Sequence, residues 1–564
     1  MTGNKGNIKD IIAKLITEGL EGYARKEGVT IPEDFEIIIE QPKVKEFGDY
    51  ASNAAMQAAS IFRKNPMIIA ENVVGNIPSN QIIGEIKAAR PGFINIHVAA
   101  EAGQDVILQI LSEGEGYGRN NSGGGTSVLI EFMSANPTGP LHIGHARNAI
   151  LGDSIARILE ATGYNVTREY YYNDAGVQMK KLGQSLRARY LQALGHDIPF
   201  PEDGYRGEYM KKIAELLEKE KGNSLENEED LRIFTIYAAD HIIELIDKDM
   251  KSLGINFNNW FSETTLHNEG KVEECLGFLK KKEMIYEKEG AWWLRSEKFG
   301  DEKDRVVIKS DGEKTYLAPD IAYHKNKINR GFDFLINIFG GDHHGYVSRL
   351  KAGVGALGYD PGRLECIVFQ MVTLLKDGER IKLSTRAGKF ITLKDAIKEL
   401  GADVVRFFFL MRSADSQMTF DWQLAKDHSM NNPVFYVQYA HARCCSLFKK
   451  ADELGIEWKG PEECDLTLLE LPEEQEVIRA LEKYPEIVQL CSDTREPHHV
   501  TVYLRETASA FHSLFTQGTK DETKRFIVPG NPPLTQSRLT LAAAIKTVLS
   551  NALNLIGITP MERM

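Results

Sequence analysis

Two histidines, His142 and His145, lie three residues apart where a turn-rich segment gives way to a helical pattern. This spacing at the start of a helix puts both imidazoles on one side. A helix start also presents unpaired N–H groups and the positive end of the helix dipole, which favour a negatively charged ligand. Imidazole donors there suit a reaction in which charge develops on the phosphates of ATP. Gly144 lies between them and has no Cβ, so a flat purine could approach the backbone closely.

The elements that must hold these histidines are a strand before them and a helix after them. Residues 128–132 form an apolar run typical of a buried parallel strand, and residues 134–140 are rich in turn formers. Apolar side chains then recur at helical spacing until Gly163, at Ile150, Leu151, Ile155, Ile158 and Leu159. In an open α/β sheet, the loop after such a strand binds ligands. The alternative is that the histidines only cap the helix or pack beneath the loop.

A second group of residues that could bind a ligand contains acidic side chains. Glu131 ends the apolar strand, and a buried carboxylate without a partner is costly, so it requires a cation. Tyr316 and Asp320 are four residues apart further along the chain. Carboxylates beside an aromatic hydroxyl suit a guanidinium group, which is a planar fork of donors. The sequence therefore favours a cationic ligand, of which arginine is one candidate.

Two further segments limit the choice of function. Asp342, His343 and His344 follow an apolar strand at 334–339, but neighbours on an extended segment point to opposite sides and make poor co-ligands, so no metal site is predicted. The glycine-rich residues 114–125 contain neither a Walker motif nor GxGxxG between a strand and a helix. A P-loop kinase and a dinucleotide-binding fold are thereby disfavoured.

Taken together, these motifs resemble those of the arginyl-tRNA synthetases of bacterial type. Residues 142–145 read HIGH, the signature of class I aminoacyl-tRNA synthetases, and residues 136–141 and 146–149 flank it as in the arginyl member. A predicted hairpin at 374–381, with an Asp-Gly turn, leads into a segment that is similar to the KMSKS loop, whose cations neutralise departing pyrophosphate. Thr385 stands where that loop usually has its second lysine.

The resemblance implies roles for individual residues. The catalytic residues would be His142, His145, Lys382, Ser384 and Arg386. ATP would be bound by Gly144, His142, His145, Asp342, His343 and Lys382, and Arg147 could add charge across the site. Arginine would be bound by Glu131, Asn136, Tyr316 and Asp320. ATP is then a substrate, Mg²⁺ the expected cofactor, and tRNA(Arg) and L-arginine the expected partners.

The resemblance also predicts how the chain is divided. Residues 1–112 would form an N-terminal α+β domain that contacts the tRNA elbow through Phe93 and Asn95, although Phe93 could equally be core. A linker at 113–125 would precede a Rossmann-like α/β catalytic domain at 126–410, with an insertion at about 180–315. Residues 411–564 would form a helical anticodon-binding bundle, in which Tyr436, Tyr439 and Arg443 offer stacking and phosphate contacts. An aromatic stripe at helical spacing is more often core.

Composition agrees with a large soluble enzyme. The chain has 564 residues, which suggests several domains, with 42% hydrophobic and 26% charged residues. Its net charge of −12 argues weakly against nucleic acid, but a basic track on one face remains compatible with that sum. The six cysteines include no CxxC pair, and no apolar run approaches the ~20 residues of a membrane span. A cytoplasmic monomer without membrane contact is expected.

The function predicted from the sequence is that of an arginine–tRNA ligase. The enzyme would form arginyl-adenylate from ATP and arginine, and would then pass arginine to the 3′ end of tRNA, releasing AMP and pyrophosphate. Discrimination by carboxylates makes an editing domain unnecessary. Two rivals stay open: another class I synthetase, which should lack Glu131 and Asp320, and a non-catalytic paralogue, which the altered loop at 382–386 would suit.

Overall fold

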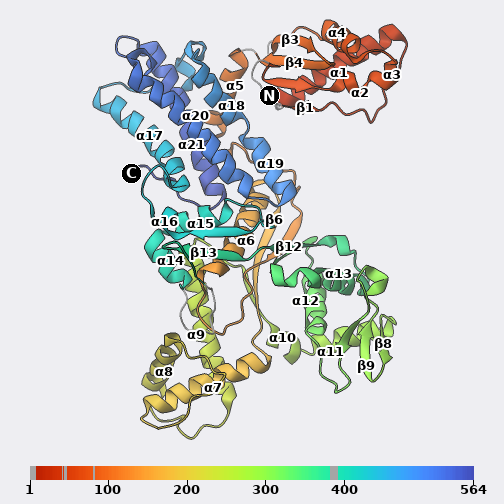
Figure 1. Cartoon of the computed structure of the whole chain (residues 1–564), viewed down its shortest axis with the longest axis vertical. Helices are drawn as coiled ribbons and strands as arrows, with labels where there is room; N and C mark the ends of the chain where they lie inside the picture. Colours follow the sequence, from red (N-terminus) through yellow and green to blue (C-terminus); the bar gives the residue numbers. More distant parts are fainter. Residues whose placement is uncertain (1–7, 41, 43–46, 81–82, 99, 382–390) are drawn as a thin grey trace. The chain divides into compact units, whose positions relative to one another are not determined.

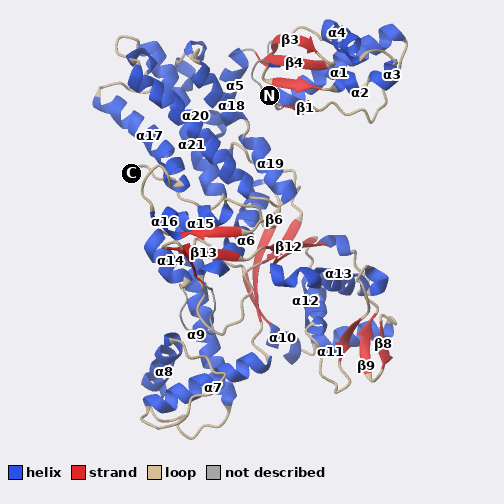
Figure 2. Ribbon diagram, viewed as in Figure 1, coloured by secondary structure: helices blue, strands red, loops and turns tan. Residues whose placement is uncertain are grey.

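The computed structural model describes residues 8–40, 42, 47–80, 83–98, 100–381 and 391–564. Two compact units divide the chain, and each is considered by itself (Figures 1 and 2). The first contains residues 1–114, 447–482 and 510–547, and the second contains residues 115–446, 483–509 and 548–564. Long helices near the end of the chain therefore contribute to both units.

A four-stranded antiparallel sheet, in the order β1-β2-β4-β3, organises the N-terminal part of the first unit. Its elements are α1 (Ile8–Glu27), β1 (Ile39–Glu40), β2 (Tyr50–Ser52), α2 (Ala54–Gln57), α3 (Ala59–Phe62), α4 (Pro66–Asn76), β3 (Ile83–Ala89) and β4 (Phe93–Val98). Ile94 and Ile96 point into a core shared with α1 and α4. Because side chains alternate along a strand, Phe93 and Asn95 lie on the opposite face. The predicted α+β character of this region is confirmed.

A five-stranded parallel sheet, in the order β12-β11-β5-β6-β7, lies at the centre of the second unit. Its strands are β5 (Ser127–Glu131), β6 (Asn165–Tyr172), β7 (Asn259–Ser262), β11 (Phe334–Gly340) and β12 (Leu364–Phe369). The apolar run before the histidines is β5, and the helix after them is α6 (Ile143–Ala161). Both predictions are confirmed, and the carboxyl end of β5 leads into the loop before His142.

The residues between β6 and β11 contain two different substructures. The first is helical, with α7 (Gly176–Ala193), α8 (Glu208–Lys221) and α9 (Leu231–Ser252). The second comprises α10 (Glu263–Asn268), α11 (Lys271–Lys281), an antiparallel sheet of β8 (Ile285–Lys288), β9 (Ala291–Leu294) and β10 (Arg305–Ile308), and α12 (Leu317–Asn329). Strand β7 separates them and belongs to the central sheet. The interval predicted as one insertion therefore contains a strand of the nucleotide fold.

After β12 the chain forms the predicted hairpin of β13 (Val372–Lys376) and β14 (Glu379–Ile381). Asp377 and Gly378 have φ of 53° and 80°, the left-handed conformation that an Asp-Gly hairpin turn requires. Strand β15 (Met418–Asp421) pairs with β13 in parallel. The helices beside them are η4 (Gly341–Tyr346), α13 (Val347–Ala356), α14 (Leu393–Leu400) and α15 (Ala402–Leu410).

The C-terminal part is helical, as predicted. Its main helices are α16 (Trp422–Lys426), α17 (Pro433–Glu453), α18 (Pro472–Glu482), α19 (Tyr484–Thr494), α20 (His498–Lys520) and α21 (Pro532–Leu555); α5 (Ala100–Glu113) precedes the central sheet in sequence. Leu541, Ile545 and Val548 on α21 are fully buried, as their helical spacing indicates. Within the described ranges, no helix is both long and apolar enough to cross a membrane.

Candidate active site

His142 and His145 form a stacked pair at the first turn of α6. His142 is the N-cap residue, and the two ring centroids are 3.7 Å apart with an interplanar angle of 13°. The backbone N–H of His142 donates to Nδ1 of His145 at 3.2 Å, so the neutral His145 ring carries its proton on Nε2. Burial lowers the pKa of His145 to about 3 and also lowers the pKa of His142. His145 is therefore a neutral N–H donor at physiological pH.

A cavity of about 210 Å³ opens beside the carboxyl ends of β5, β6 and β11. Its walls combine acidic, aromatic and amide side chains, including Glu131, Tyr171, Asp320, Tyr323, His324, Asn337, His343 and Tyr346. Glu131 and Asp320, predicted from positions far apart in the sequence, thus line the same space. The cavity lies at the sheet edge where ligands bind in this class of fold.

Glu131 is paired with a cation of the chain itself. Its Oε2 lies 2.5 Å from Nζ of Lys327, and Ser134 Oγ donates to its Oε1 at 3.0 Å. Lys327 has no exposed side-chain surface, and that of Glu131 is 8% exposed. The predicted need of Glu131 for a cation is met inside the protein.

Asp320 has no such cation. Its carboxylate accepts a hydrogen bond from the hydroxyl of Tyr346, and no lysine or arginine among the described residues forms an ion pair with it. The pKa of Asp320 is raised to about 7, mainly by burial and also by the nearby Glu131 and Glu263, whereas the hydrogen bond from Tyr346 and the charge of Lys327 lower it. A carboxylate held in this way is stabilised by a cationic ligand.

Of the other residues predicted for the substrates, Asn136, Tyr316 and Asp342 do not line this cavity, whereas His343 does. Asn136 is exposed in the loop after β5, and its amide donates to Gln178 at 3.1 Å. Tyr316 caps α12 one turn before Asp320 and is 81% exposed. Asp342 is exposed, whereas His343 lines the cavity and stacks on Phe339 with centroids 5.6 Å apart.

Lys382, Ser384 and Arg386 lie outside the described residues, but both ends of their segment are placed. The segment follows β14, which ends at Ile381. After the segment, the carbonyl of Ile391 accepts from the N–H of Ile143 at 3.2 Å, and Thr392 forms an isolated bridge with His142. The residues that follow the predicted pyrophosphate loop, Ile391 and Thr392, therefore lie at the start of α6, beside the histidines.

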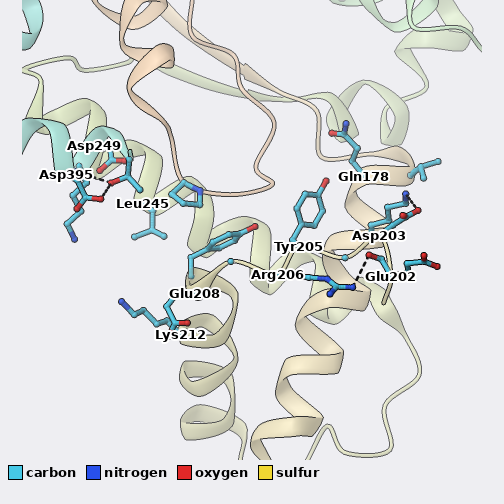
Figure 3. A pocket seen from close by; sticks show the side chains of 18 residues that line it. Gln178, Glu202, Asp203, Tyr205, Arg206, Glu208, Lys212, Leu245, Asp249 and Asp395 are labelled. Atoms are coloured by element: carbon cyan, nitrogen blue, oxygen red, sulfur yellow. Dashed lines mark hydrogen bonds and ion pairs between the residues drawn. The ribbon is translucent and has the colours of Figure 1, made fainter. Parts of the chain in front are cut away.

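A larger cavity of about 880 Å³ adjoins the loop before the histidines (Figure 3). Pro140, Tyr205, Arg206, Lys212 and Asp249 are among its lining residues, which carry both signs of charge. The hydroxyl of Tyr209, also in its wall, donates to the carbonyl of Thr138 at 2.6 Å. This contact connects the helical insertion to the loop that precedes the HIGH residues.

The predicted role of Arg147 does not agree with its position. Its side chain is 2% exposed, and its guanidinium donates to the carbonyls of Gln370, Ser413, Ala414 and Ser416 at 2.7 to 3.3 Å. Burial lowers its pKa to about 10, so it remains charged. Arg147 therefore holds the segments after β12 and α15 against α6, and the bonds of its buried guanidinium go to backbone carbonyls.

Replacing Arg147 with methionine is expected to lower the free energy of unfolding by at least about 3 kcal/mol, because it leaves several buried carbonyls without donors. Denaturant unfolding of the purified chain measures this loss. The exposed Arg412 is the matched control, and Arg412→Met should change stability by less than about 0.5 kcal/mol. Equal stability of Arg147→Met and the unmodified chain would contradict this assignment.

The residues predicted to contact tRNA differ in exposure. Asn95 is 8% exposed, whereas Phe93 is half-buried on the same face of β4. Tyr436, Tyr439 and Arg443 are half-buried along α17, and the Arg443 guanidinium lies 4.2 Å from the ring centroid of Tyr439. Their neighbours Val437 and Ala440 are fully buried, so the three side chains lie outside the core.

Comparison with known proteins gives the family. Three family models match consecutive parts of the chain: "Arginyl tRNA synthetase N terminal domain" at 5–98, "tRNA synthetases class I (R), catalytic domain" at 106–407, and "DALR anticodon binding domain" at 437–564. The arginine–tRNA ligase of Bacillus licheniformis is 44% identical over 561 residues, covering 99% of each chain. The chain belongs to the arginyl-tRNA synthetase family.

Solved structures agree with this membership. A putative arginyl-tRNA synthetase from Campylobacter jejuni is 34% identical, covers 83% of this chain and 100% of its own, and superposes with a TM-score of 0.74. The Thermus thermophilus arginyl-tRNA synthetase has the same fold at 20% identity, with a TM-score of 0.75 and coverage of 98% and 100%. The sequence resemblance and the predicted class I fold are confirmed for this member of the arginyl-tRNA synthetase family.

The sequence pattern did not predict several residues in or behind the wall of this synthetase's cavity. Lys327, Asn337 and Tyr346 all contact the predicted carboxylates or their partners. One signal was present: Asp320, Tyr323, His324 and Lys327 are spaced at i, i+3, i+4 and i+7, which places four polar side chains on one helical face. Tyr346 and Asn337 carry no comparable pattern, because only the folded chain brings them to α12.

Proposed function

We propose that the chain is an arginine–tRNA ligase that activates L-arginine with ATP and transfers it to the 3′ end of tRNA(Arg). In the first step the arginine carboxylate attacks the α-phosphate of ATP, forming arginyl-adenylate and releasing pyrophosphate. In the second, a ribose hydroxyl at the tRNA terminus attacks the activated carbonyl and AMP leaves. The observation that carries the proposal is the cavity at the sheet edge, where Asp320 lacks a cation, in the same fold as the neutral His142–His145 pair at the start of α6.

The cavity would recognise the amino acid by charge. The guanidinium of arginine would pair with Asp320 and approach Tyr346, and Glu131 would add negative charge from elsewhere in the lining. Tyr316 lies one turn before Asp320, and Asn136 lies in the loop after β5. Neither lines the cavity, and both would contact the part of arginine that extends beyond it. The uncharged side chain of another amino acid would leave Asp320 without a cation and would gain no ion pair in this cavity.

The nucleotide would lie over the start of α6. Gly144 and the N–H groups of the first turn would face the phosphates, and Nε2–H of His145 would donate to oxygen atoms that gain charge as pyrophosphate departs. His343, Asp342, Lys382, Ser384 and Arg386 are proposed to complete the nucleotide site. Neutral histidines serve this purpose because they donate without needing a proton from solvent.

Mg²⁺ would arrive on the phosphates of ATP. Among the described residues, the one group of three side chains able to share an ion is Glu496, His498 and His499, and its two imidazoles are a poor match for a cation that prefers oxygen ligands. The acidic walls of the 210 Å³ cavity hold a single carboxylate without a cation and offer no octahedral oxygen set. The ion would offset charge on the phosphates, while the chain positions the substrates.

We further propose that the chain acts as a monomer in the cytoplasm, as its resemblance to the arginyl-tRNA synthetases implies. Tyr436, Tyr439 and Arg443 on α17 would contact the anticodon region, and Phe93 with Asn95 the tRNA elbow.

The test is attachment of radiolabelled amino acids to a tRNA pool by the purified full chain with ATP and Mg²⁺. Arginine alone among the twenty should enter the acid-precipitable tRNA fraction. Attachment of a different amino acid would assign another class I activity, and binding of tRNA without any attachment would assign a non-catalytic role.

A further inference from the structure

One face of α12 carries polar side chains into the protein interior. Tyr323, His324 and Lys327 on this face are only 1%, 2% and 0% exposed. They meet two neighbouring strands of the central sheet, where Glu131 of β5 and Asn337 of β11 are partners in register. A buried lysine at such a place requires a full set of partners.

Lys327 has these partners. Its Nζ lies 2.5 Å from Oε2 of Glu131 and 3.0 Å from Oδ1 of Asn337, and 4.3 Å from the ring centroid of Tyr323. Two oxygen acceptors and an aromatic face therefore surround the ammonium group. The pair holds Glu131 in one place on the wall of the cavity.

Hydrogen bonds continue from this pair to Asp320. The amide oxygen of Asn337 accepts from Lys327, which fixes the orientation of the amide. The amide nitrogen of Asn337 then donates to Nε2 of His324 at 2.8 Å. The opposite nitrogen of the same ring, Nδ1, donates to the backbone carbonyl of Asp320 at 2.8 Å. Both nitrogens of His324 are thus committed in its neutral form, and burial keeps its pKa well below the ordinary value. His324 adds no charge to the cavity.

The charges of the cavity walls can therefore be counted. Glu131 and Asp320 are the acidic lining residues, and Lys327 is the cation that contacts one of them. Behind the wall, Glu169 is paired with Arg330 at 2.6 and 2.8 Å, and Glu263, which accepts from the hydroxyl of Tyr171, does not line the cavity. Among the lining residues, one carboxylate without a cation therefore remains.

We propose that Lys327 is a positioning residue that limits the cavity to one excess negative charge and fixes Glu131, so that a single guanidinium completes its charge balance. The inference rests on the proposed function and names the residue that makes the cavity selective for a monocation. If Glu131 loses its charge, Lys327 becomes an uncompensated ammonium that repels the guanidinium of arginine. If both charges are removed, the excess of one negative charge is restored.

The test compares Glu131→Gln, Lys327→Met and the double variant in the full chain. Binding of radiolabelled arginine is measured by equilibrium dialysis, and the KM values for arginine and ATP by pyrophosphate exchange. Glu131→Gln should weaken arginine binding about 100-fold or more. The double variant should bind arginine at least about tenfold better than Glu131→Gln, because the second substitution removes the repelling ammonium. The KM for ATP should stay within about twofold throughout, because ATP does not enter this charge balance.

Arg406→Met is the control for a general loss of stability. Arg406 forms an equally buried pair with Asp153 at 2.6 Å, between α15 and α6, and lies outside the cavity lining. The Arg406→Met variant should unfold at a lower temperature than the unmodified chain but bind arginine equally well. A double variant that binds arginine no better than Glu131→Gln would overturn the role of Lys327. Folded, unmodified protein that binds no arginine would instead overturn the proposed function.

Discussion

Asp320→Asn is expected to lower kcat/KM for arginine by roughly 10²–10³, because it removes the one cavity carboxylate that lacks a cation. The amide is almost the same size as the carboxylate, so the cavity should keep its shape. The loss should appear mainly in the KM for arginine, with the KM for ATP nearly unchanged. Pyrophosphate exchange at varied arginine concentration gives both values.

Asp301→Asn is the matched control for this substitution. Asp301 is also buried, but Arg305 holds it at 2.7 and 2.8 Å within the insertion and lowers its pKa to about 2. Its replacement should leave the KM for arginine unchanged. An Asp320→Asn enzyme with the arginine KM of the unmodified chain would exclude Asp320 from the site.

The same carboxylate gives the reaction a predicted pH dependence. In the free protein the pKa of Asp320 is about 7, whereas the guanidinium of arginine stays protonated, so binding favours the ionised carboxylate. The value of kcat/KM for arginine should therefore fall about tenfold between pH 8 and pH 6, and be level above pH 8. The groups facing Asp320 that set this value are Glu131, Glu263, Lys327 and Tyr346. In the Asp320→Asn variant, kcat/KM for arginine should no longer fall between pH 8 and pH 6. If it still falls in that variant, the fall would belong to the titration of another group.

The histidine pair is expected to govern the chemical step. His145→Ala should lower the rate of pyrophosphate exchange at saturating substrates by roughly 10²–10³, the usual effect of removing one donor that stabilises developing charge. Arginine binding by dialysis should not change, because neither histidine lines the cavity around Asp320. His142→Ala should act in the same direction.

Two comparisons separate this role from helix capping. His145→Gln, whose amide can both accept from the His142 N–H and donate an N–H, should recover part of the lost rate, whereas His145→Glu, which can only accept, would preserve the cap and should not recover it. His196→Ala, on the surface beside Glu226, is the control and should have no effect. Since burial lowers the pKa of His145 to about 3, its protonation should not appear in rate profiles between pH 5.5 and 8. A rate that is unchanged in His145→Ala would contradict the assignment.

The parts of this fold that local pattern determines were predictable. Strand β5, helix α6 and the β13–β14 hairpin follow from an apolar run, helical spacing and an Asp-Gly turn, each of which acts over a few residues. Strand β7 was not separated from its surroundings, because its four residues, NWFS, are only half-buried and carry no run of apolar side chains. Its place in the sheet depends on pairing with β6.

In the candidate site, too, features set by neighbouring residues were predictable, whereas contacts between residues far apart in the sequence were not. The sequence indicated that Glu131 needs a cation, but Lys327, which supplies it, is 196 residues away. Arg147 was mistaken for a possible ATP contact because a basic residue near the HIGH residues can serve either a ligand or the fold. Only the carbonyls of Gln370 and Ser413, more than 200 positions later, decide between these roles.

The central claim is tested most directly by ATP–pyrophosphate exchange with each of the twenty amino acids, with and without tRNA(Arg). We predict exchange with arginine and with no other amino acid. If bound tRNA completes the segment in which Thr385 stands in place of a lysine, the rate of exchange should increase when tRNA is present. Exchange that depends on a different amino acid, or none from folded protein that binds arginine, ATP and tRNA, would contradict the assignment of this chain as an arginine–tRNA ligase.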